Sequence, residues 1–170
     1  DEMGQDEIIE CLPALYRYAR VLTRNEDDAQ DLLQDTLLRA HERRATYVAG
    51  RPLRNWLFAI LRNSYIDNGR RRRSEAARID ALRVLQPDHD PGGQQYAAML
   101  AEVAERFDTL PAAQREVLHL VAVEGLSYSD AAEALEVPVG TVMSRLSRAR
   151  ALLREPKEFG GGLRLVKEKD

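Results

Sequence analysis

Residues 127–154, SYSDAAEALEVPVGTVMSRLSRARALLR, decide the fold of the second half of the chain. Ser127, followed three residues later by Asp130, is close to the capping box that begins a helix, and a short helix is predicted over 127–135. After a tight connection, a longer helix rich in arginine is predicted over 139–154. This is the order of a helix-turn-helix, whose second helix enters the major groove of DNA.

The predicted second helix of this motif has an apolar and a polar side. Its apolar residues recur at three- and four-residue spacing and are expected to form a buried stripe: Val142, Leu146, Ala149 and Leu153. The opposite side carries Thr141, Ser144, Arg145 and Arg148. Arginine can bond guanine through two hydrogen bonds, while serine and threonine reach bases or phosphates. A solvated amphipathic helix is the alternative, but the tight connection and the absence of acids from the helix favour DNA.

A second group of residues indicates contact with single-stranded nucleic acid. The predicted helix over 53–70 carries Trp56 and Asn63 and runs into Arg70, Arg71, Arg72 and Arg73. Aromatic side chains stack on bases, and a cationic cluster neutralises phosphates. A tryptophan in a small bundle is usually core, so for Trp56 both interpretations stay open. Arginines also suit the end of a helix, but four in succession exceed that need.

The periodicity is helical nearly throughout, so we predict an all-α protein made of two small helical domains. Along the helix over 53–70, Trp56, Ile60 and Tyr65 are expected to face inward. The other helices are expected over 8–24, 26–44, 96–109 and 111–124. Residues 86–95, QPDHDPGGQQ, have turn and linker composition. We therefore place a first domain at 1–74, a flexible linker at 75–96, a second domain at 97–156 and a tail at 157–170.

Charge is distributed unevenly along a chain whose net charge is −3. Residues 51–73 hold seven arginines and one aspartate, a local charge of +6, and 139–154 hold four arginines and no acid. Residues 25–35 hold five acids and no base. Two basic surfaces on an acidic protein favour two contacts with a polyanion and a separate surface for another partner. That separate surface is predicted on the helix over 26–44, at Asp31, Gln34 and Asp35, with Leu38 further along; a solvated face is the alternative.

Several classes of protein are excluded by what the sequence lacks. No apolar run approaches the ~20 residues of a membrane span, and the acidic start has no secretion signal, so a cytoplasmic protein without membrane contact is expected. Cys11 is the single cysteine, and the histidines stand far apart, so neither a disulfide nor a metal site is expected. Since no nucleophile has a nearby base and no glycine-rich loop binds phosphate, we expect neither an enzyme nor a cofactor.

Two long segments resemble a known family of transcription factors. Residues 29–40, AQDLLQDTLLRA, resemble the polymerase-binding helix of region 2 of bacterial sigma factors, and 52–73 resemble the promoter-melting part of that region. The second half, with EGLSY at 124–128 and VPVGTVMSRL at 137–146, resembles region 4 of the extracytoplasmic-function group. The resemblance covers roughly 12–154. Glu136 stands where relatives often have glycine.

The resemblance implies a role for each group of residues. Asp31, Gln34, Asp35 and Leu38 would dock on the β′ coiled coil of core RNA polymerase, whose β flap is a further expected contact. The minus-10 promoter element would be captured as a flipped base and a separated strand by Tyr47, Trp56, Asn63, Arg70, Arg71 and Arg72. The minus-35 element would be read as duplex by Thr141, Ser144, Arg145 and Arg148. An anti-sigma factor is expected to control the protein, which would serve a stress or envelope response.

Two other functions compete with a sigma factor. A sigma mimic would titrate an anti-sigma factor without binding DNA, but it would have little use for arginines on both DNA-facing surfaces. A plain helix-turn-helix repressor would not need the helix of Trp56 and Asn63 or the acidic docking face. Loss of DNA binding with retained capture of an anti-sigma factor would identify the mimic.

Overall fold

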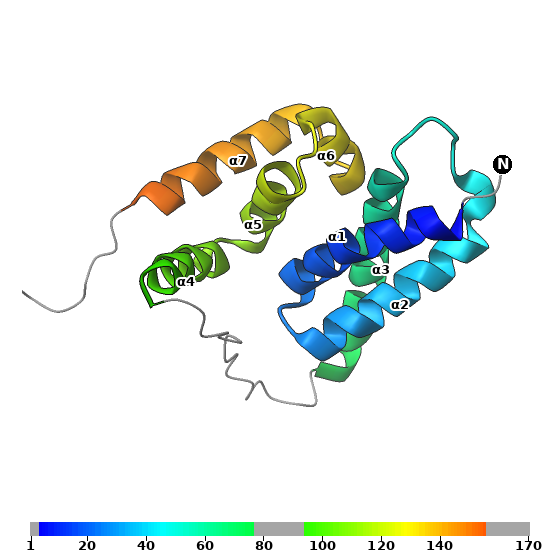
Figure 1. Cartoon of the computed structure of the whole chain (residues 1–170), viewed down its shortest axis with the longest axis horizontal. Coiled ribbons are helices and arrows are strands. Elements are labelled where there is room, and N and C mark those ends of the chain that lie inside the picture. The colour runs from blue at the N-terminus through cyan, green and yellow to red at the C-terminus, as the bar shows by residue number, and fades with distance from the viewer. Residues whose placement is uncertain (1–3, 77–93, 156–170) are drawn as a thin grey trace, which may run out of the picture.

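The computed structural model describes residues 4–76 and 94–155, and within these the side chains of 70–76 and 94–97 are left aside. The described residues form helices and no strand, which confirms the all-α prediction. The first group is α1 (Gln5–Thr23), α2 (Glu26–Glu42), the short 3-10 turn η1 (Arg44–Thr46) and α3 (Leu53–Ala76). The second is α4 (Gln94–Thr109), α5 (Ala112–Leu118), the π-helical turn η2 (His119–Val123), α6 (Tyr128–Leu135) and α7 (Val139–Arg154). Figure 1 shows the two groups side by side.

The first group, α1 to α3, is a three-helix bundle around an apolar core. Leu15 and Tyr18 of α1 and Leu57, Phe58 and Leu61 of α3 have no exposed surface. The rings of Tyr18 and Phe58 meet edge to face with centroids 5.3 Å apart, a favoured geometry for aromatic pairs. Each such side chain stabilises the fold by about 1.5–3 kcal/mol when removed from water.

The second helix begins as its sequence predicts. The side chain of Asn25 accepts a 3.0 Å hydrogen bond from the backbone N–H of Asp28, which satisfies one of the free donors at the helix start. Glu26, Asp27 and Asp28 occupy the first turn, where the helix dipole favours negative charge. These features fix the start of the helix that carries the predicted docking face.

The helix-turn-helix forms at the predicted residues. Ser127 caps α6 by accepting a 3.0 Å hydrogen bond from the N–H of Asp130, and α7 spans 139–154 as expected. Glu136 occupies the turn with φ +54°, a left-handed conformation that glycine adopts without strain. Val142 and Leu146 are buried, as is Ala149, while Leu153 is half-buried.

Three expectations about the helices were wrong in detail. Tyr65 does not face inward but is 37% exposed, because it lies on the side of α3 that turns away from the bundle core. The α3 helix continues to Ala76, past the expected end at residue 70. The helix expected over 111–124 changes to the wider η2 turn at His119, where the N–H of Glu124 bonds the carbonyl of His119.

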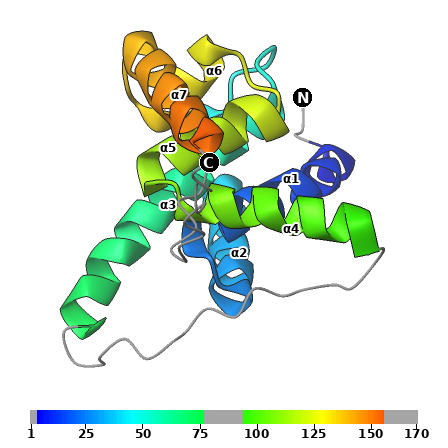
Figure 2. The same ribbon diagram turned by 90° about the vertical axis from the view of Figure 1, so that its left-hand side faces the viewer.

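The two groups of helices pack against each other. The α3 helix contacts α6, and α1 contacts α5 and η2, so the first half of the chain touches the helix-turn-helix half directly. In Figure 2 the last turns of α3 project away from these contacts. The predicted linker falls mainly on 77–93 and the predicted tail lies within 156–170, both outside the described residues.

Candidate nucleic-acid and partner-binding surfaces

The predicted docking face lies on the outer side of α2. Asp31 and Gln34 are exposed, and Leu38 is 65% exposed beside them. A large apolar side chain held in water next to carboxylates suits a protein interface, where an apolar centre is surrounded by polar groups. The three side chains form one exposed strip, because residues three and four apart share a helix face.

Asp35, the fourth predicted docking residue, is half-buried and already engaged. It accepts a 2.9 Å hydrogen bond from the side-chain amide of Asn68 on α3. One turn further, Arg39 forms a 2.7 Å ion pair with Asp67, also on α3. These two contacts join α2 to α3, so Asp35 helps to hold the docking face in place.

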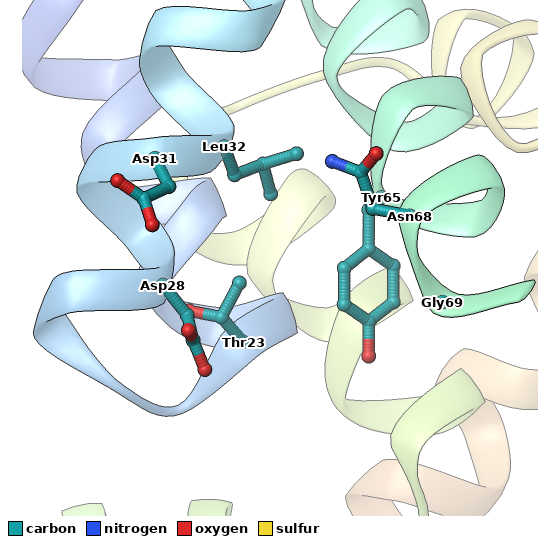
Figure 3. A pocket seen from close by; sticks show the side chains of 7 residues that line it. All are labelled: Thr23, Asp28, Asp31, Leu32, Tyr65, Asn68 and Gly69. Carbon is teal, nitrogen blue, oxygen red and sulfur yellow. The ribbon is translucent and has the colours of Figure 1, made fainter. Parts of the chain in front are cut away.

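A small hollow of about 170 Å³ adjoins this face. Figure 3 shows two carboxylates of α2, Asp28 and Asp31, on one side, and Tyr65 and Asn68 of α3 on the other. The exposed ring of Tyr65 is therefore a wall of this hollow, which explains why it does not reach the core. The full lining is Thr23, Asp28, Asp31, Leu32, Tyr65, Asn68 and Gly69.

The loop between α2 and α3 brings two of the predicted minus-10 residues together. The rings of Tyr47 and Trp56 lie with centroids 5.4 Å apart, and both are half-buried against the bundle core. The Tyr47 hydroxyl donates a 2.9 Å hydrogen bond to the carbonyl of Arg51, which closes the loop over Gly50 with its φ of +101°. The pair is thus a rigid aromatic surface, part core and part exposed.

The remaining predicted minus-10 residues lie further along α3. Asn63 is half-buried. Arg70, Arg71 and Arg72 belong to the helical backbone of α3, but their side chains lie outside the described residues. The backbone of the arginine cluster therefore lies at the projecting end of α3 (Figure 2).

The predicted minus-35 residues share the outer side of α7. Ser144 and Arg148 are exposed, and Thr141 and Arg145 are partly exposed. The Ser144 hydroxyl donates a 3.2 Å hydrogen bond to the carbonyl of Thr141, so it lies close to the helix surface. Since the residues at 142, 146 and 149 are buried, these four side chains lie together on the face away from the core.

Polar residues that pair where the two groups of helices meet, most of them buried, were missed by the sequence analysis. We call them the interdomain cluster: Arg17, Tyr18 and Arg62 from the first group, and Glu116, His119 and Glu124 from the second. A sequence signal existed, since Glu116 and His119 fall on the same helical stripe as Leu120, but it does not identify their partners.

Burial changes the titration of two members of this cluster. Burial, followed by the neighbouring Glu116 carboxylate, raises the pKa of Tyr18 well above its ordinary value. Burial also lowers the pKa of His119, although Glu124 opposes the shift. The His119 Nε2 atom lies 3.2 Å from Glu124 Oε1 without hydrogen-bond alignment, so this contact is an electrostatic one. The cluster therefore favours a neutral phenol and a neutral imidazole.

Within 4–76 and 94–155, no three or more His, Cys, Asp or Glu side chains are grouped so that they could hold a metal ion. In that part of the chain no helix is long and apolar enough to cross a membrane.

Two family models match the chain. Residues 8–75 match the model of sigma-70 region 2, and residues 100–153 match that of sigma-70 region 4. The first match covers α1 to α3, with the docking face and the aromatic pair. The second covers most of α4 and all of α5 to α7, with the helix-turn-helix.

Relatives of known identity agree with these models. The chain is 40% identical over 149 residues to the ECF RNA polymerase sigma factor EcfG of Rhodopseudomonas palustris, covering 88% of this chain and 82% of that one. It is 36% identical over 139 residues to the ECF sigma factor SigM of Mycobacterium tuberculosis, covering 82% and 69%. Its structure resembles that of the sigma factor RpoE in complex with the anti-sigma factor NepR from Bartonella quintana, with a TM-score of 0.76, 36% identity, and coverage of 88% and 92%.

A two-domain protein with an exposed acidic helix, an aromatic and arginine-rich helix and a helix-turn-helix has the parts of a transcription initiation factor. The chain belongs to the extracytoplasmic-function group of the sigma-70 family. It is a promoter-specificity subunit of bacterial RNA polymerase, and its two regions are those through which this family binds core polymerase and promoter DNA.

Proposed function

We propose that this sigma factor binds core polymerase through Asp31, Gln34 and Leu38 on the outer side of α2, with Asp35 holding that face in place. The observation that carries the proposal is the exposed strip of Asp31, Gln34 and Leu38 within the residues that match sigma-70 region 2. The adjoining hollow extends the same surface to Tyr65 and Asn68.

Promoter DNA contacts the other two surfaces in this proposal. The pair of Tyr47 and Trp56, with Asn63 and the arginines at the end of α3, takes the minus-10 strand after it separates. Removing a base from the stack costs a few kcal/mol, and stacking on an aromatic pair together with phosphate contacts offsets that cost. The outer side of α7, with Arg145 and Arg148, reads the minus-35 duplex in the major groove.

Control by an anti-sigma factor is part of the proposal. The related RpoE of Bartonella quintana is in complex with the anti-sigma factor NepR, and CnrH, 32% identical with a TM-score of 0.60, is in complex with the cytosolic domain of CnrY. We extend this mode of control to the present chain.

The protein acts in the cytoplasm, where polymerase and chromosome are, and contributes binding rather than catalysis. The domain limits remain those predicted from the sequence, 1–74 and 97–156. The α3 helix extends two residues past the first limit, to Ala76.

Core binding is tested by the affinity of the full chain for purified core polymerase. Asp31→Arg and Leu38→Asp are each expected to weaken binding by about tenfold or more, because the first reverses a charge of the acidic face and the second buries an unpaired carboxylate in place of an apolar contact. Glu10→Arg makes the same charge change as Asp31→Arg on exposed α1 and serves as the control. Equal affinities for all four proteins would contradict the proposed docking face.

Promoter reading is tested with genomic fragments selected by the intact holoenzyme. Arg148→Ala is expected to reduce holoenzyme retention on these fragments by about tenfold, given the worth of a good base contact. Arg150→Ala is the matched control, because Arg150 is also exposed but lies nearly opposite Arg148 on α7. Similar losses for the two variants would mean a nonspecific effect of positive charge.

A further inference from the structure

Beside the apolar core that runs through both groups of helices, the contact between the two sigma regions contains buried polar residues. Glu116, His119 and Glu124 are 8%, 4% and 5% exposed, although all three can carry charge. Fully buried charged residues are rare unless they are paired. Each of these three meets the other region, so their burial depends on the two regions being together.

Glu116 of α5 is held by two helices of the region 2 bundle. Its Oε1 atom accepts a hydrogen bond from the hydroxyl of Tyr18 on α1 and a 2.8 Å hydrogen bond from Nε of Arg62 on α3. Tyr18 is itself completely buried, and the Arg62 side chain is only 19% exposed. One carboxylate therefore fixes the position of region 4 against two helices at once.

Glu124, after η2, makes a second connection. Its two oxygens accept hydrogen bonds of 2.8 and 3.1 Å from Nε and a terminal nitrogen of Arg17, the bidentate geometry in which guanidinium and carboxylate groups fit best. The ring of His119 lies parallel to that of Tyr18, with centroids 6.0 Å apart. The interdomain cluster thus joins α1 and α3 to α5 and η2 through directional contacts.

Directional polar contacts have a different consequence from apolar packing. When the two regions separate, the carboxylates and guanidinium groups become exposed to water, which solvates them well. Few apolar groups become exposed at these positions. A buried ion pair adds little net stability but strongly disfavours arrangements that bury one partner alone. The contact is therefore specific in geometry and open to separation, as expected of an interface between domains that move.

The same contact covers part of the helix proposed to hold the minus-10 strand. Arg62, which Glu116 engages, is the neighbour of Asn63 on α3, and α3 also packs against α6. At the edge, Arg51 in the loop closed by Tyr47 forms an ion pair with Glu133 of α6. Region 4 in this position lies against the helix and the loop that carry the residues proposed to receive the separated strand.

We propose that the interdomain cluster is a latch that keeps the free chain closed, and that core polymerase binds the form in which the latch is released. That polymerase binds the open form rests on the proposed function, whereas closure of the free chain does not. The cluster thus lowers the amount of free sigma factor competent to bind polymerase, without any other protein.

The latch is tested by the distance between the two regions in the full chain. Spin or fluorescent labels are attached to Glu10→Cys on α1 and Arg150→Cys on α7, both exposed sites, in a Cys11→Ser background. With the cluster intact, the distance between the two labels is expected to be short and narrowly distributed. In the variant Glu116→Gln with Glu124→Gln, the open fraction is expected to rise by about tenfold or more, since both carboxylates are lost.

Glu102→Gln is the matched control, because it removes a carboxylate from a 2.9 Å ion pair with Arg106 inside α4. It is expected to leave the distance unchanged. Tyr18→Phe removes one hydroxyl and keeps the aromatic ring, so it decides the result if the glutamine variant loses helical circular dichroism. A wild-type distribution as broad as that of the variants, or cluster variants that stay as closed as the control, would overturn the latch.

The affinity of the same proteins for core polymerase tests whether polymerase binds the open form. The open variant is expected to bind about threefold or more tightly than wild type, because less of the binding energy is used to open the chain. Equal affinities despite an opened distance would show that opening is not required for polymerase binding. Absence of binding by every form, wild type included, would refute the proposed function, while the distances would still decide the latch.

Discussion

Tyr18 belongs to two regions of the molecule that are built differently. In the core of the bundle its ring meets Phe58 edge to face, among side chains with no exposed surface. At the contact with region 4 its ring lies parallel to His119 and its hydroxyl donates to Glu116. The bundle core is apolar and close-packed, whereas the contact with region 4 adds directional polar interactions to apolar packing. The difference indicates that the pairing of the two regions is more easily undone than the bundle itself.

The largest effect is expected in the apolar core. Phe58→Ala removes a fully buried ring and should destabilise the protein by about 3–5 kcal/mol, the usual cost of truncating a core aromatic residue. Urea unfolding followed by circular dichroism measures this loss. A loss below about 1 kcal/mol would mean that the core is looser than its burial implies.

A smaller effect is expected from Tyr18→Phe, which separates the two roles of Tyr18. The ring keeps its contact with Phe58, while Glu116 loses one of its two donors but keeps Arg62. We expect the free energy of unfolding to fall by about 1.5–3 kcal/mol, typical of one hydrogen bond to a charged group. A double-mutant cycle with Glu116→Gln isolates this contact, and strict additivity would show that the two side chains do not interact.

The pH dependence tests the polar contact alone. Burial lowers the pKa of His119 in the closed form, where it faces Glu124 on its own segment and Arg17 and Tyr18 on α1. In the open form the solvated imidazole regains an ordinary value of about 6.5 and takes up a proton more readily. The closed form should therefore be most favoured above about pH 6.5 and should open as the pH falls further.

The labelled chain described above measures this opening. His119→Gln should flatten the change in open fraction near pH 6, because glutamine takes up no proton in this range. A closed fraction that increases on acidification would contradict the assignment of a neutral, buried imidazole.

The left-handed backbone of Glu136 allows region 4 to be stabilised without changing the contact between regions 2 and 4. Glu136 has φ +54°, so Glu136→Gly should stabilise region 4 by up to about 1 kcal/mol by relieving the left-handed backbone. Thermal unfolding measures the gain, and the distance between regions should stay at the wild-type value. A lower melting temperature would show that the Glu136 side chain contributes more than its backbone costs.

The smallest effect is expected at the edge of the contact. The side chains of Arg51 and Glu133 are 65% and 62% exposed, and exposed ion pairs contribute about 0.2–1 kcal/mol. Arg51→Ala should change the urea midpoint and the open fraction only slightly. An open fraction as large as that of the Glu116 and Glu124 variant would show that the Arg51–Glu133 pair, and not the buried cluster, holds the two regions together.

Local features of this fold could be predicted from the sequence because their causes are local. The cap of α6 at Ser127 follows from spacing alone, and the burial of Val142 and Leu146 follows from helical periodicity. The outward position of Ser144 and Arg148 follows from the same pattern. The functional roles of these surface residues remain predictions.

What could not be predicted depends on distant partners. The Tyr18 hydroxyl meets Glu116 across 98 residues of sequence, and Arg17 meets Glu124 across 107. No periodicity links such residues, and a charged side chain on a helix is ordinarily assigned to solvent. Tyr65 failed for a related reason, since its helical position alone could not show that it lines a hollow beside α2.

Promoter-dependent initiation is the property that most directly defines a sigma factor. Run-off transcription with purified core polymerase and selected genomic fragments should start at defined sites only when the intact chain is present. Leu38→Asp and Arg148→Ala should each abolish or strongly reduce the transcripts, while Glu10→Arg and Arg150→Ala should leave them. No initiation from any fragment, together with tight capture of an anti-sigma factor, would contradict the account and identify the chain as a sigma mimic.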